Sequence, residues 1–255
     1  MVIGSKQWKR LIQTGAAELG ISVPDIAVNC FAVHGRELIQ WNRKVNLTAI
    51  TEPYQVAIKH YLDAIVPTTV LPRQASLLDI GSGGGFPGIP LKILLPSLSV
   101  TLIDAARKKI NFLKHVIRTL ALDDIIAIQV RAEDLQQCYK TPGIGQVCAG
   151  STKGTLPIAA GGIQIDQPFD VVISRALTSL IKFIEMALPL LQKDGMLIAL
   201  KGRLADSELA QAQKKLDEVL YAAGFHPEGC DLKVQRYRLP SLGAERTMVT
   251  LKMRR

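Results

Sequence analysis

Two hydrophobic patterns divide the chain. In residues 24–39 and 56–66 apolar positions recur every three or four residues, which is typical of amphipathic helices. After Pro72 short, almost continuous apolar runs alternate with helical patterns. Such runs are typical of parallel strands that are buried on both faces. The pattern therefore predicts a small N-terminal helical region over residues 1–72 and an α/β domain over residues 73–255.

The α/β domain shows a regular alternation of strands and helices. The expected strands cover residues 77–80, 100–104, 125–130, 169–174 and 196–201. The expected helices cover residues 87–95, 106–120, 179–191 and 206–223. This alternation predicts a doubly wound, Rossmann-like parallel sheet. A glycine-rich stretch at about residues 139–167 interrupts it and predicts a mobile surface insertion, with a short hairpin as the alternative.

Two further apolar runs, residues 232–239 and 247–253, end the chain. The connection between them, residues 240–243, is too short for a crossover helix, so the two strands are expected to be antiparallel. A mostly parallel seven-stranded sheet that ends in an antiparallel hairpin is the arrangement of class I methyltransferases. A dinucleotide dehydrogenase would add another crossover instead.

The most specific motif is LLDIGSGGGFPG, residues 77–88. Glycines let the backbone adopt φ > 0 and approach a ligand closely, so this cluster at a strand end predicts a nucleotide-binding turn. The dinucleotide pattern GxGxxG is present over residues 83–88, but here Gly81 already closes the strand. Asp79 is a poor neighbour for a pyrophosphate and suits a ligand with a cationic amine and a sulfonium. The motif favours S-adenosylmethionine at Asp79, Gly81 and Gly83 over NAD.

Ligands of open α/β sheets bind beyond the carboxyl ends of the strands. Asp104 ends the second strand, where its carboxylate could accept both ribose hydroxyls. A cap for the helix that begins at Ala105 or Ala106 is the alternative, and the two roles are compatible. Residues 131–134 follow the third strand and are expected beside the adenine, with Ala132 leaving room for the ring. Solvated loop charges are the alternative there.

The sequence Ser174-Arg175-Ala176 follows the fourth strand and bears on the reaction type. A methyltransferase of amino groups would need an Asp/Asn-Pro-Pro-aromatic turn here, and one of pyrimidine C5 would need a Pro-Cys nucleophile. An arginine without a base suits a target atom with an available lone pair, such as guanine N7, because alignment then supplies most of the catalysis. Arg175 is predicted to position cofactor or guanine, with no general base assigned. A structural salt bridge is the alternative.

A formal charge of +9 and an isoelectric point near 9.5 favour an anionic partner, RNA or DNA before membrane. Arg107, Lys108 and Lys109 lie in the first turn of a predicted helix, where each cation opposes the helix dipole by roughly 0.3 to 1 kcal/mol. That cost favours an anionic partner, with a solvated helix face as the alternative. Lys201 and Arg246 complete the predicted RNA-binding residues.

Cysteine and histidine spacing does not predict a metal site. The chain has four cysteines without C-x-x-C spacing, which are expected to be reduced thiols: Cys30, Cys138, Cys148 and Cys230. The start of the chain lacks the apolar segment of a secretory signal, and no apolar run is long enough to cross a membrane. We therefore expect a cytoplasmic protein, not associated with membranes, and a monomer.

A resemblance to a known family rests on six segments: WNRKVNLT (41–48), KHYLD (59–63), DIGSGGGFPGIPL (79–91), KINFL (109–113), ISRA (173–176) and LKG (200–202). Together they resemble the bacterial RsmG family, also called glucose-inhibited division protein B. Its members are guanine-N7 methyltransferases of 16S ribosomal RNA. The likeness covers nearly the whole chain apart from the first twenty or so residues and the insertion.

The resemblance implies S-adenosylmethionine as methyl donor and a guanine of 16S ribosomal RNA, presented in the small ribosomal subunit, as substrate. It also implies cofactor contacts at these positions: Gly81, Phe86, Asp104, Ala105, Ala106, Ala132, Glu133 and Arg175. The glycine-rich insertion departs from the family's short connection at this point. Two alternatives stay open from the residues alone, an NAD-dependent oxidoreductase and a non-catalytic RNA-binding assembly factor on the same fold.

Overall fold

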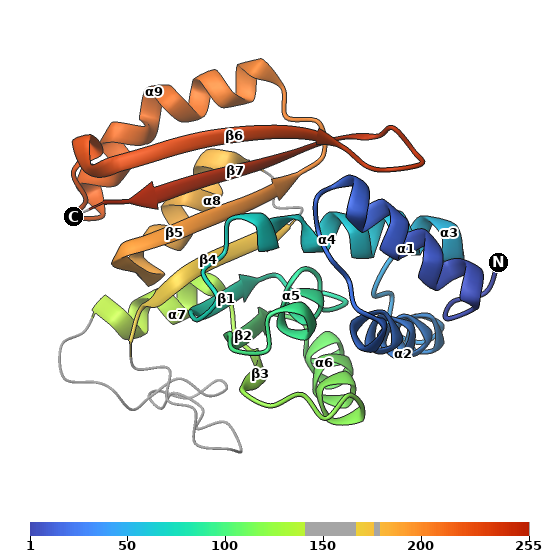
Figure 1. The fold of residues 1–255 in the computed structure, drawn as a ribbon. Helices are drawn as coiled ribbons and strands as arrows, with labels where there is room; N and C mark the ends of the chain where they lie inside the picture. Colours follow the sequence, from blue (N-terminus) through green and yellow to red (C-terminus); the bar gives the residue numbers. More distant parts are fainter. Residues whose placement is uncertain (141–166, 176–178, 255) are drawn as a thin grey trace.

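The computed structural model describes residues 1–140, 167–175 and 179–254, and its centre is a twisted seven-stranded sheet with helices on both faces (Figure 1). The strands are β1 Ser76–Ile80, β2 Ser99–Asp104, β3 Ile125–Gln129, β4 Phe169–Arg175, β5 Leu191–Lys201, β6 Cys230–Arg238 and β7 Glu245–Met253. Their order is β3-β2-β1-β4-β5-β7-β6. Only the β5–β7 and β6–β7 pairs are antiparallel, which confirms the predicted sheet and its C-terminal hairpin.

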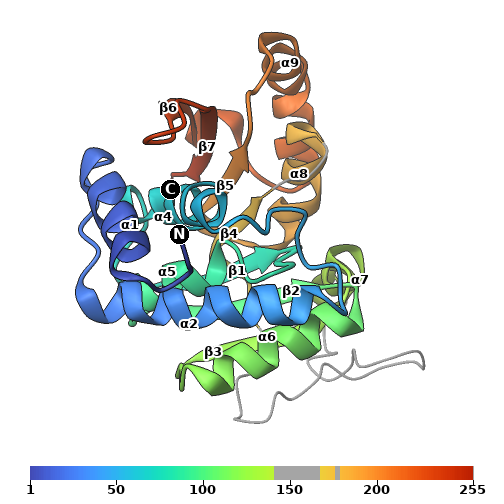
Figure 2. The same cartoon turned by 90° about the vertical axis from the view of Figure 1, so that its right-hand side faces the viewer.

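Helices cover the sheet and form the N-terminal region. They are α1 Lys6–Glu18, α2 Asp25–Asn42, α3 Pro53–Gln55, α4 Asp63–Ile65, α5 Gly88–Leu94, α6 Arg107–Thr119, α7 Ala132–Lys140, α8 Leu180–Ala187 and α9 Asp206–Ala222. A π-helical segment, Val56–Leu62, joins α3 to α4. The N-terminal helices, α5 and α6 lie on one side of the sheet, and α7, α8 and α9 lie on the other (Figure 2).

Several predicted boundaries are wrong, each for a local reason. The helix expected over residues 179–191 ends at Ala187, since Pro189 removes a backbone donor and turns the chain into β5. Residues 132–134, for which a solvated loop was the alternative, lie in the first turn of α7, which begins at Ala132. The first turn of α7 carries the acidic residues Glu133 and Asp134, and the helix dipole stabilises their negative charges. Most of the predicted insertion, residues 141–166, lies outside the described residues.

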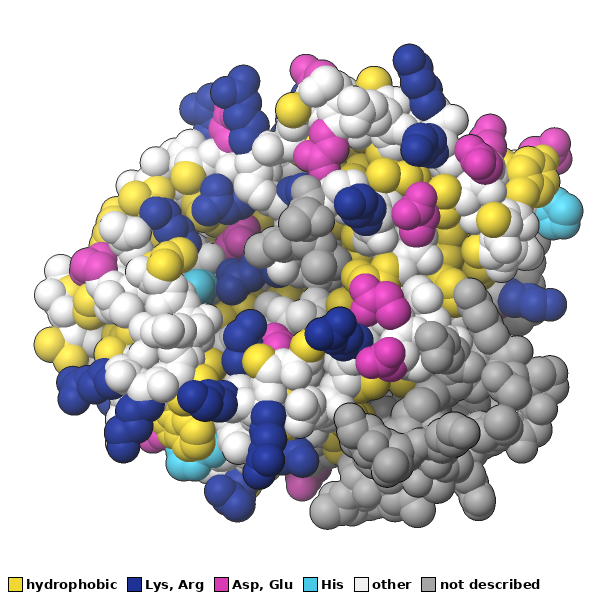
Figure 3. Space-filling view, turned by 180° about the vertical axis from the view of Figure 1, so that it is seen from behind, with side chains coloured by type: hydrophobic (Ala, Val, Ile, Leu, Met, Phe, Trp, Pro, Cys, Tyr) yellow, Lys and Arg dark blue, Asp and Glu magenta, His cyan; other side chains and the backbone are white. Residues whose placement is uncertain are grey.

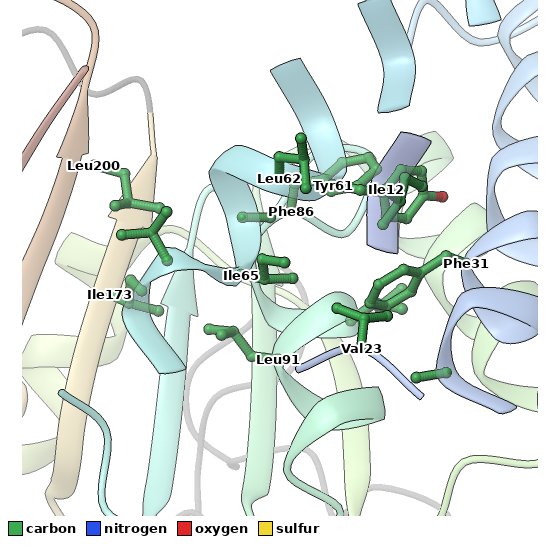
Figure 4. Packing of buried hydrophobic residues seen from close by; sticks show 14 of the residues in the cluster. Ile12, Val23, Phe31, Tyr61, Leu62, Ile65, Phe86, Leu91, Ile173 and Leu200 are labelled. Carbon is green, nitrogen blue, oxygen red and sulfur yellow. The ribbon is translucent and has the colours of Figure 1, made fainter. Parts of the chain in front are cut away.

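The N-terminal helices share one hydrophobic core with the sheet. Along β4 and β5, alternate side chains point to opposite faces, so Ile173 and Leu200 turn toward the N-terminal helices. Figure 4 shows Leu62 and Ile65 packed between these two strand residues and Phe31 of α2. The segment of residues 56–66 is therefore buried between the sheet and the outer helices. This packing fixes the N-terminal region against the carboxyl ends of the strands.

His34 connects helix α2 to the glycine loop that follows β1. Its Nε2 lies 2.8 Å from the carbonyl oxygen of Gly84, to which it donates a hydrogen bond, and its ring stacks on Phe86 with the centroids 4.8 Å apart. The side chain is fully buried. Burial lowers the pKa of His34 to about 4, so the imidazole is neutral at physiological pH.

This buried histidine predicts a pH-dependent contribution to stability. An unfolded histidine has a pKa near 6.5, so between pH 6.5 and about 4 the unfolded chain binds the extra proton, and stability falls as the pH falls. Replacing His34 by Gln keeps an N–H donor and removes the titration. We expect the wild type to lose about 1.5 kcal/mol relative to the His34→Gln variant between pH 6.5 and 5.

Urea unfolding of both proteins across this pH range measures the difference. The other buried acids and histidines are common to both proteins and cancel. Parallel pH profiles would show that folding does not lower the pKa of His34.

Candidate active site

The glycine loop lies at the carboxyl end of β1 and is tied to β2. The amides of Gly81 and Ser82 both donate hydrogen bonds to the carbonyl of Ile103, at 2.9 and 3.0 Å. Gly81 has φ +72°, and a Cβ there would meet no atom within 4 Å. At Gly88, by contrast, a Cβ would lie 2.3 Å from the Leu102 side chain. Gly81 therefore borders open space, as a ligand-contacting glycine should, whereas Gly88 is required for packing.

Asp79 lies beneath this loop and is fully buried. Its Oδ2 accepts a hydrogen bond of 2.9 Å from the Gly88 amide, while its Oδ1 has no hydrogen-bond partner among the described residues. Burial raises the pKa of Asp79 to about 7, although the Gly88 amide and the nearby Arg175 favour the ionised form. Because neither oxygen is exposed, Asp79 can attract a cation through its charge but does not touch it directly.

Asp104 organises the end of β2. Its Oδ1 accepts a hydrogen bond of 2.9 Å from the Ala106 amide, and its Oδ2 accepts one of 3.2 Å from the Gly83 amide. The Nζ of Lys109 lies 3.3 Å from the same Oδ2. The carboxylate therefore supports the start of α6 and fixes the glycine loop. This helix-end role was the alternative for Asp104, and it leaves the predicted ribose role possible because each oxygen accepts more than one donor.

The turns after β2 and β3 lie side by side. Asp104 pairs with Gln129 in the sheet, and the Gln129 side chain donates a hydrogen bond of 3.3 Å to the Ala105 carbonyl. Ala132 is buried at the start of α7, and Glu133 beside it is exposed. The fold thus brings the residues predicted to bind ribose and adenine to one edge of the sheet.

Arg175 ends β4 and points toward the segment between α3 and α4. Its Nη1 donates a hydrogen bond of 3.1 Å to the Lys59 carbonyl, and its Nη2 lies 3.2 Å from His60 Nδ1. The guanidinium carbon lies 5.0 Å from the ring centroid of Phe86, in cation–π geometry. Its side chain is 18% exposed and forms an ion pair with Asp63, so the structural salt bridge proposed as an alternative is present.

His60 supports Arg175 and had no predicted role. Its ring stacks on Phe86 at a centroid distance of 4.6 Å, and its Nε2 lies 2.8 Å from the Thr48 hydroxyl oxygen. Burial, Arg175 and His34 lower the pKa of His60 to about 3. Because Nδ1 accepts a hydrogen bond from Arg175 Nη2, the neutral ring carries its own proton on Nε2. Both ring nitrogens are engaged, so His60 does not serve as a general base.

Asp63 is the second functional residue that sequence reasoning missed. It is 5% exposed, and its carboxylate lies 2.8 Å from the Tyr237 hydroxyl, 3.5 Å from Arg246 Nε and 3.7 Å from Arg175 Nη1. Burial raises the pKa of Asp63, while Tyr237 and the two guanidinium groups oppose that effect. A sequence signal did exist, because the acid interrupts the apolar pattern of residues 56–66. A buried carboxylate needs partners, and here it has three.

The predicted RNA-binding residues differ in their availability. Lys109 pairs with Asp104, Arg246 with Asp63, and the 13% exposed Lys201 lies 2.6 Å from Glu208. Arg107 and Lys108 are exposed at the start of α6. Figure 3 shows Lys and Arg side chains over the lower left and the middle of one face. The described part of the chain holds no cluster of metal-ligating side chains and no helix long and apolar enough to cross a membrane.

The strand order and a glycine loop at the carboxyl edge define an S-adenosylmethionine-dependent class I methyltransferase. Cofactor-bound Rv0187 from MTB shares the fold, with a TM-score of 0.53 at 15% identity over 88% of this chain and 89% of that one. Trm5b from Pyrococcus abyssi also shares it, with a TM-score of 0.50 at 12% identity over 79% and 49%.

The family profile described as rRNA small subunit methyltransferase G matches residues 29–146 and 157–224, and this chain belongs to that family. The protein of that name from Geobacter sp. (strain M21) is 37% identical over 243 residues, 95% of this chain and 96% of its own. The one from Syntrophus aciditrophicus (strain SB) is 38% identical over 214 residues, 83% and 79% of the two chains. Family membership confirms the predicted resemblance and favours methyl transfer over the oxidoreductase alternative.

Asp63 predicts a large effect on stability. Replacing Asp63 by Asn leaves two guanidinium groups without their shared counter-charge in a buried site, which we expect to lower the free energy of unfolding by about 3 kcal/mol. The matched control is Asp231→Asn, because Asp231 pairs with exposed Lys233 and Arg254. That substitution should change the free energy of unfolding little, because exposed ion pairs contribute little to stability. Urea unfolding measures both values, and equal losses would contradict a special role for Asp63.

Proposed function

We propose that this protein transfers a methyl group from S-adenosylmethionine to N7 of a guanine in 16S ribosomal RNA of the small ribosomal subunit. The observation that carries the proposal is Arg175, which is held at the end of β4 by a hydrogen bond and an ion pair. Methyltransferases that act on amino groups need at this position a turn that accepts hydrogen bonds from the amine. The family name and the basic charge support it. We further infer that the protein acts in the cytoplasm as a monomer.

The cofactor fits between the glycine loop and the turns after β2 and β3. Gly81 presents backbone to the open space, and the buried Asp79 attracts the ammonium and sulfonium charges. Asp104 accepts hydrogen bonds from the ribose hydroxyls, and the turn at Ala132 and Glu133 borders the adenine. Phe86, held against His60, forms the wall toward Arg175. When bound, S-adenosylmethionine supplies the electrophilic methyl group.

Guanine N7 carries a lone pair in the plane of its ring, so the acceptor loses no proton before it attacks. The site therefore needs alignment more than a base, which agrees with a neutral His60 that is occupied at both nitrogens. Arg175 has five N–H donors, and those not used by Lys59 and His60 can bind guanine O6. In this arrangement Arg175 positions the guanine beside the cofactor.

The direct test is incubation of the full-length protein with labelled S-adenosylmethionine and small subunits that lack the modification. We expect label in 7-methylguanosine at one position of the 16S ribosomal RNA. Replacing Arg175 by Lys keeps the positive charge but removes the planar guanidinium group and its fixed N–H donors. Because the guanine is then poorly aligned, kcat should fall about a hundredfold. The exposed Arg118, on the outer part of α6, supplies the matched control Arg118→Lys, which should retain full activity.

Two results would contradict the proposal. Label that enters only protein would exclude RNA as substrate, and label in another RNA atom would exclude guanine N7. If RNA binds tightly but no label appears under any condition, the chain is the non-catalytic assembly factor.

The pKa of Asp79 predicts how cofactor affinity depends on pH. The ionised carboxylate attracts the cationic ligand and the protonated form does not, so affinity should fall as the pH drops through about 7. For S-adenosylhomocysteine, whose ammonium group is charged in this range, we expect binding on the order of tenfold weaker at pH 6 than at pH 8. Binding at pH 7 should also release about half a proton per molecule, because about half of the Asp79 carboxyls are protonated at that pH.

Calorimetry in two buffers of different ionisation enthalpy measures both the dissociation constant and the proton release. The Asp79→Asn variant should bind weakly and lose the pH dependence. A wild-type affinity that does not change between pH 6 and 8 would show that Asp79 does not sense the ligand's charge.

A further inference from the structure

A basic pocket lies outside the candidate cofactor site, between the loop that follows β5 and the end of the β6–β7 hairpin where the two strands are connected. Its volume is about 540 Å³, within the range of small-ligand pockets. The charged side chains that line it are Arg203, Asp206, Arg236, Arg238, Glu245 and Arg246. The hairpin end projects beyond β5 toward the N-terminal helices (Figure 1), where the Tyr54 hydroxyl donates a hydrogen bond of 3.2 Å to the Ser241 carbonyl.

Three arginines of this pocket remain available to an anion. Arg203 and Arg238 share one carboxylate, that of Glu245, at 3.6 and 3.8 Å, and Arg236 pairs with Asp206. Their side chains are 86%, 75% and 60% exposed, respectively. Exposed pairs of this kind contribute little to stability, so an anion can replace the carboxylates at low cost. Three guanidinium groups against two carboxylates leave one positive charge uncompensated.

The pocket is connected to Arg175 through two residues of its wall and through Asp63. Tyr237 and Arg246 form part of the pocket wall, and both bind Asp63, which forms the ion pair with Arg175. The pocket therefore lies next to the predicted acceptor position. In the strand order it lies beyond β4, toward β7 and β6, whereas β2 with Asp104 lies in the opposite direction. A pocket at this place is open to the phosphate of a nucleotide that neighbours a guanine held at Arg175.

We propose that this pocket binds a phosphate of the RNA strand next to the target nucleotide, through Arg203, Arg236 and Arg238. A guanidinium fork matches the geometry of phosphate oxygens and binds them in pairs. The inference rests on the proposed function, because it requires an RNA substrate. Lys201 and Arg246, the two predicted RNA-binding residues on this side, form ion pairs with Glu208 and Asp63.

Steady-state methylation of small subunits that lack the modification tests this inference. We expect the triple substitution Arg203→Ala, Arg236→Ala and Arg238→Ala to raise KM for the subunits about tenfold, with kcat changed less than about twofold. The slope of log(kcat/KM) against log[salt] should become shallower by about one, as expected for one lost phosphate contact. Binding of S-adenosylhomocysteine should stay as in the wild type.

Two matched variants sharpen the result. Glu245→Gln frees both arginines that share this carboxylate and should lower KM about two- to threefold, opposite in sign to the arginine substitutions. A control triple variant removes the same number of charges from exposed lysines far from the pocket, Lys193→Ala, Lys214→Ala and Lys215→Ala. It should change KM less than about twofold.

The outcomes separate this inference from the proposed function. If the wild type methylates the RNA while the arginine variant keeps the wild-type KM and salt slope, the pocket does not bind the substrate. If the control lysine variant loses as much affinity as the arginine variant, the effect is one of net charge and the pocket is not a site. If the wild type transfers no methyl group to RNA, the proposed function itself fails.

Discussion

The buried carboxylate of Asp63 holds together parts of the molecule that are distant in sequence. It accepts a hydrogen bond from Tyr237 of β6 and faces the guanidinium groups of Arg175 at the end of β4 and Arg246 of β7. An isolated buried charge is costly, so each of these contacts depends on the others. The C-terminal hairpin, the central sheet and the N-terminal helices therefore meet at one fixed point. The position of Arg175 follows from that point.

Aromatic packing fixes the other side of the same site. Phe86 of the glycine loop lies between His34 of α2 and His60, with both imidazoles stacked on its ring. Both histidines stay neutral because burial lowers their pKa values, so they pack as flat polar rings instead of repelling Arg175. The N-terminal helices therefore form part of the candidate active site, although the sequence pattern separates them from the α/β domain.

The sheet and the cofactor half of the site could be predicted because their signals are local. Strands buried on both faces are continuous apolar runs. Asp104 and Arg175 end their strands, and Asp79 is the last residue but one of β1, at the edge where ligands bind. The supporting contacts could not be predicted in this way. Tyr237 and Asp63 are 174 positions apart in sequence, so no spacing rule relates them. The same limit applies to Lys201, whose charge was visible while its partly buried ion pair with Glu208 was not.

The balance of charge in the site is consistent with the proposed chemistry. Methyl transfer from a sulfonium to guanine N7 moves one positive charge from cofactor to base and leaves the total unchanged. A site for this reaction has no new charge to stabilise and mainly has to align two reactants. The buried ionisable groups match that need, because Asp63 anchors Arg175 and Asp104 fixes the glycine loop. In the proposed site Asp79 acts on the cofactor through its charge, whereas Asp104 acts on it through hydrogen bonds from the ribose.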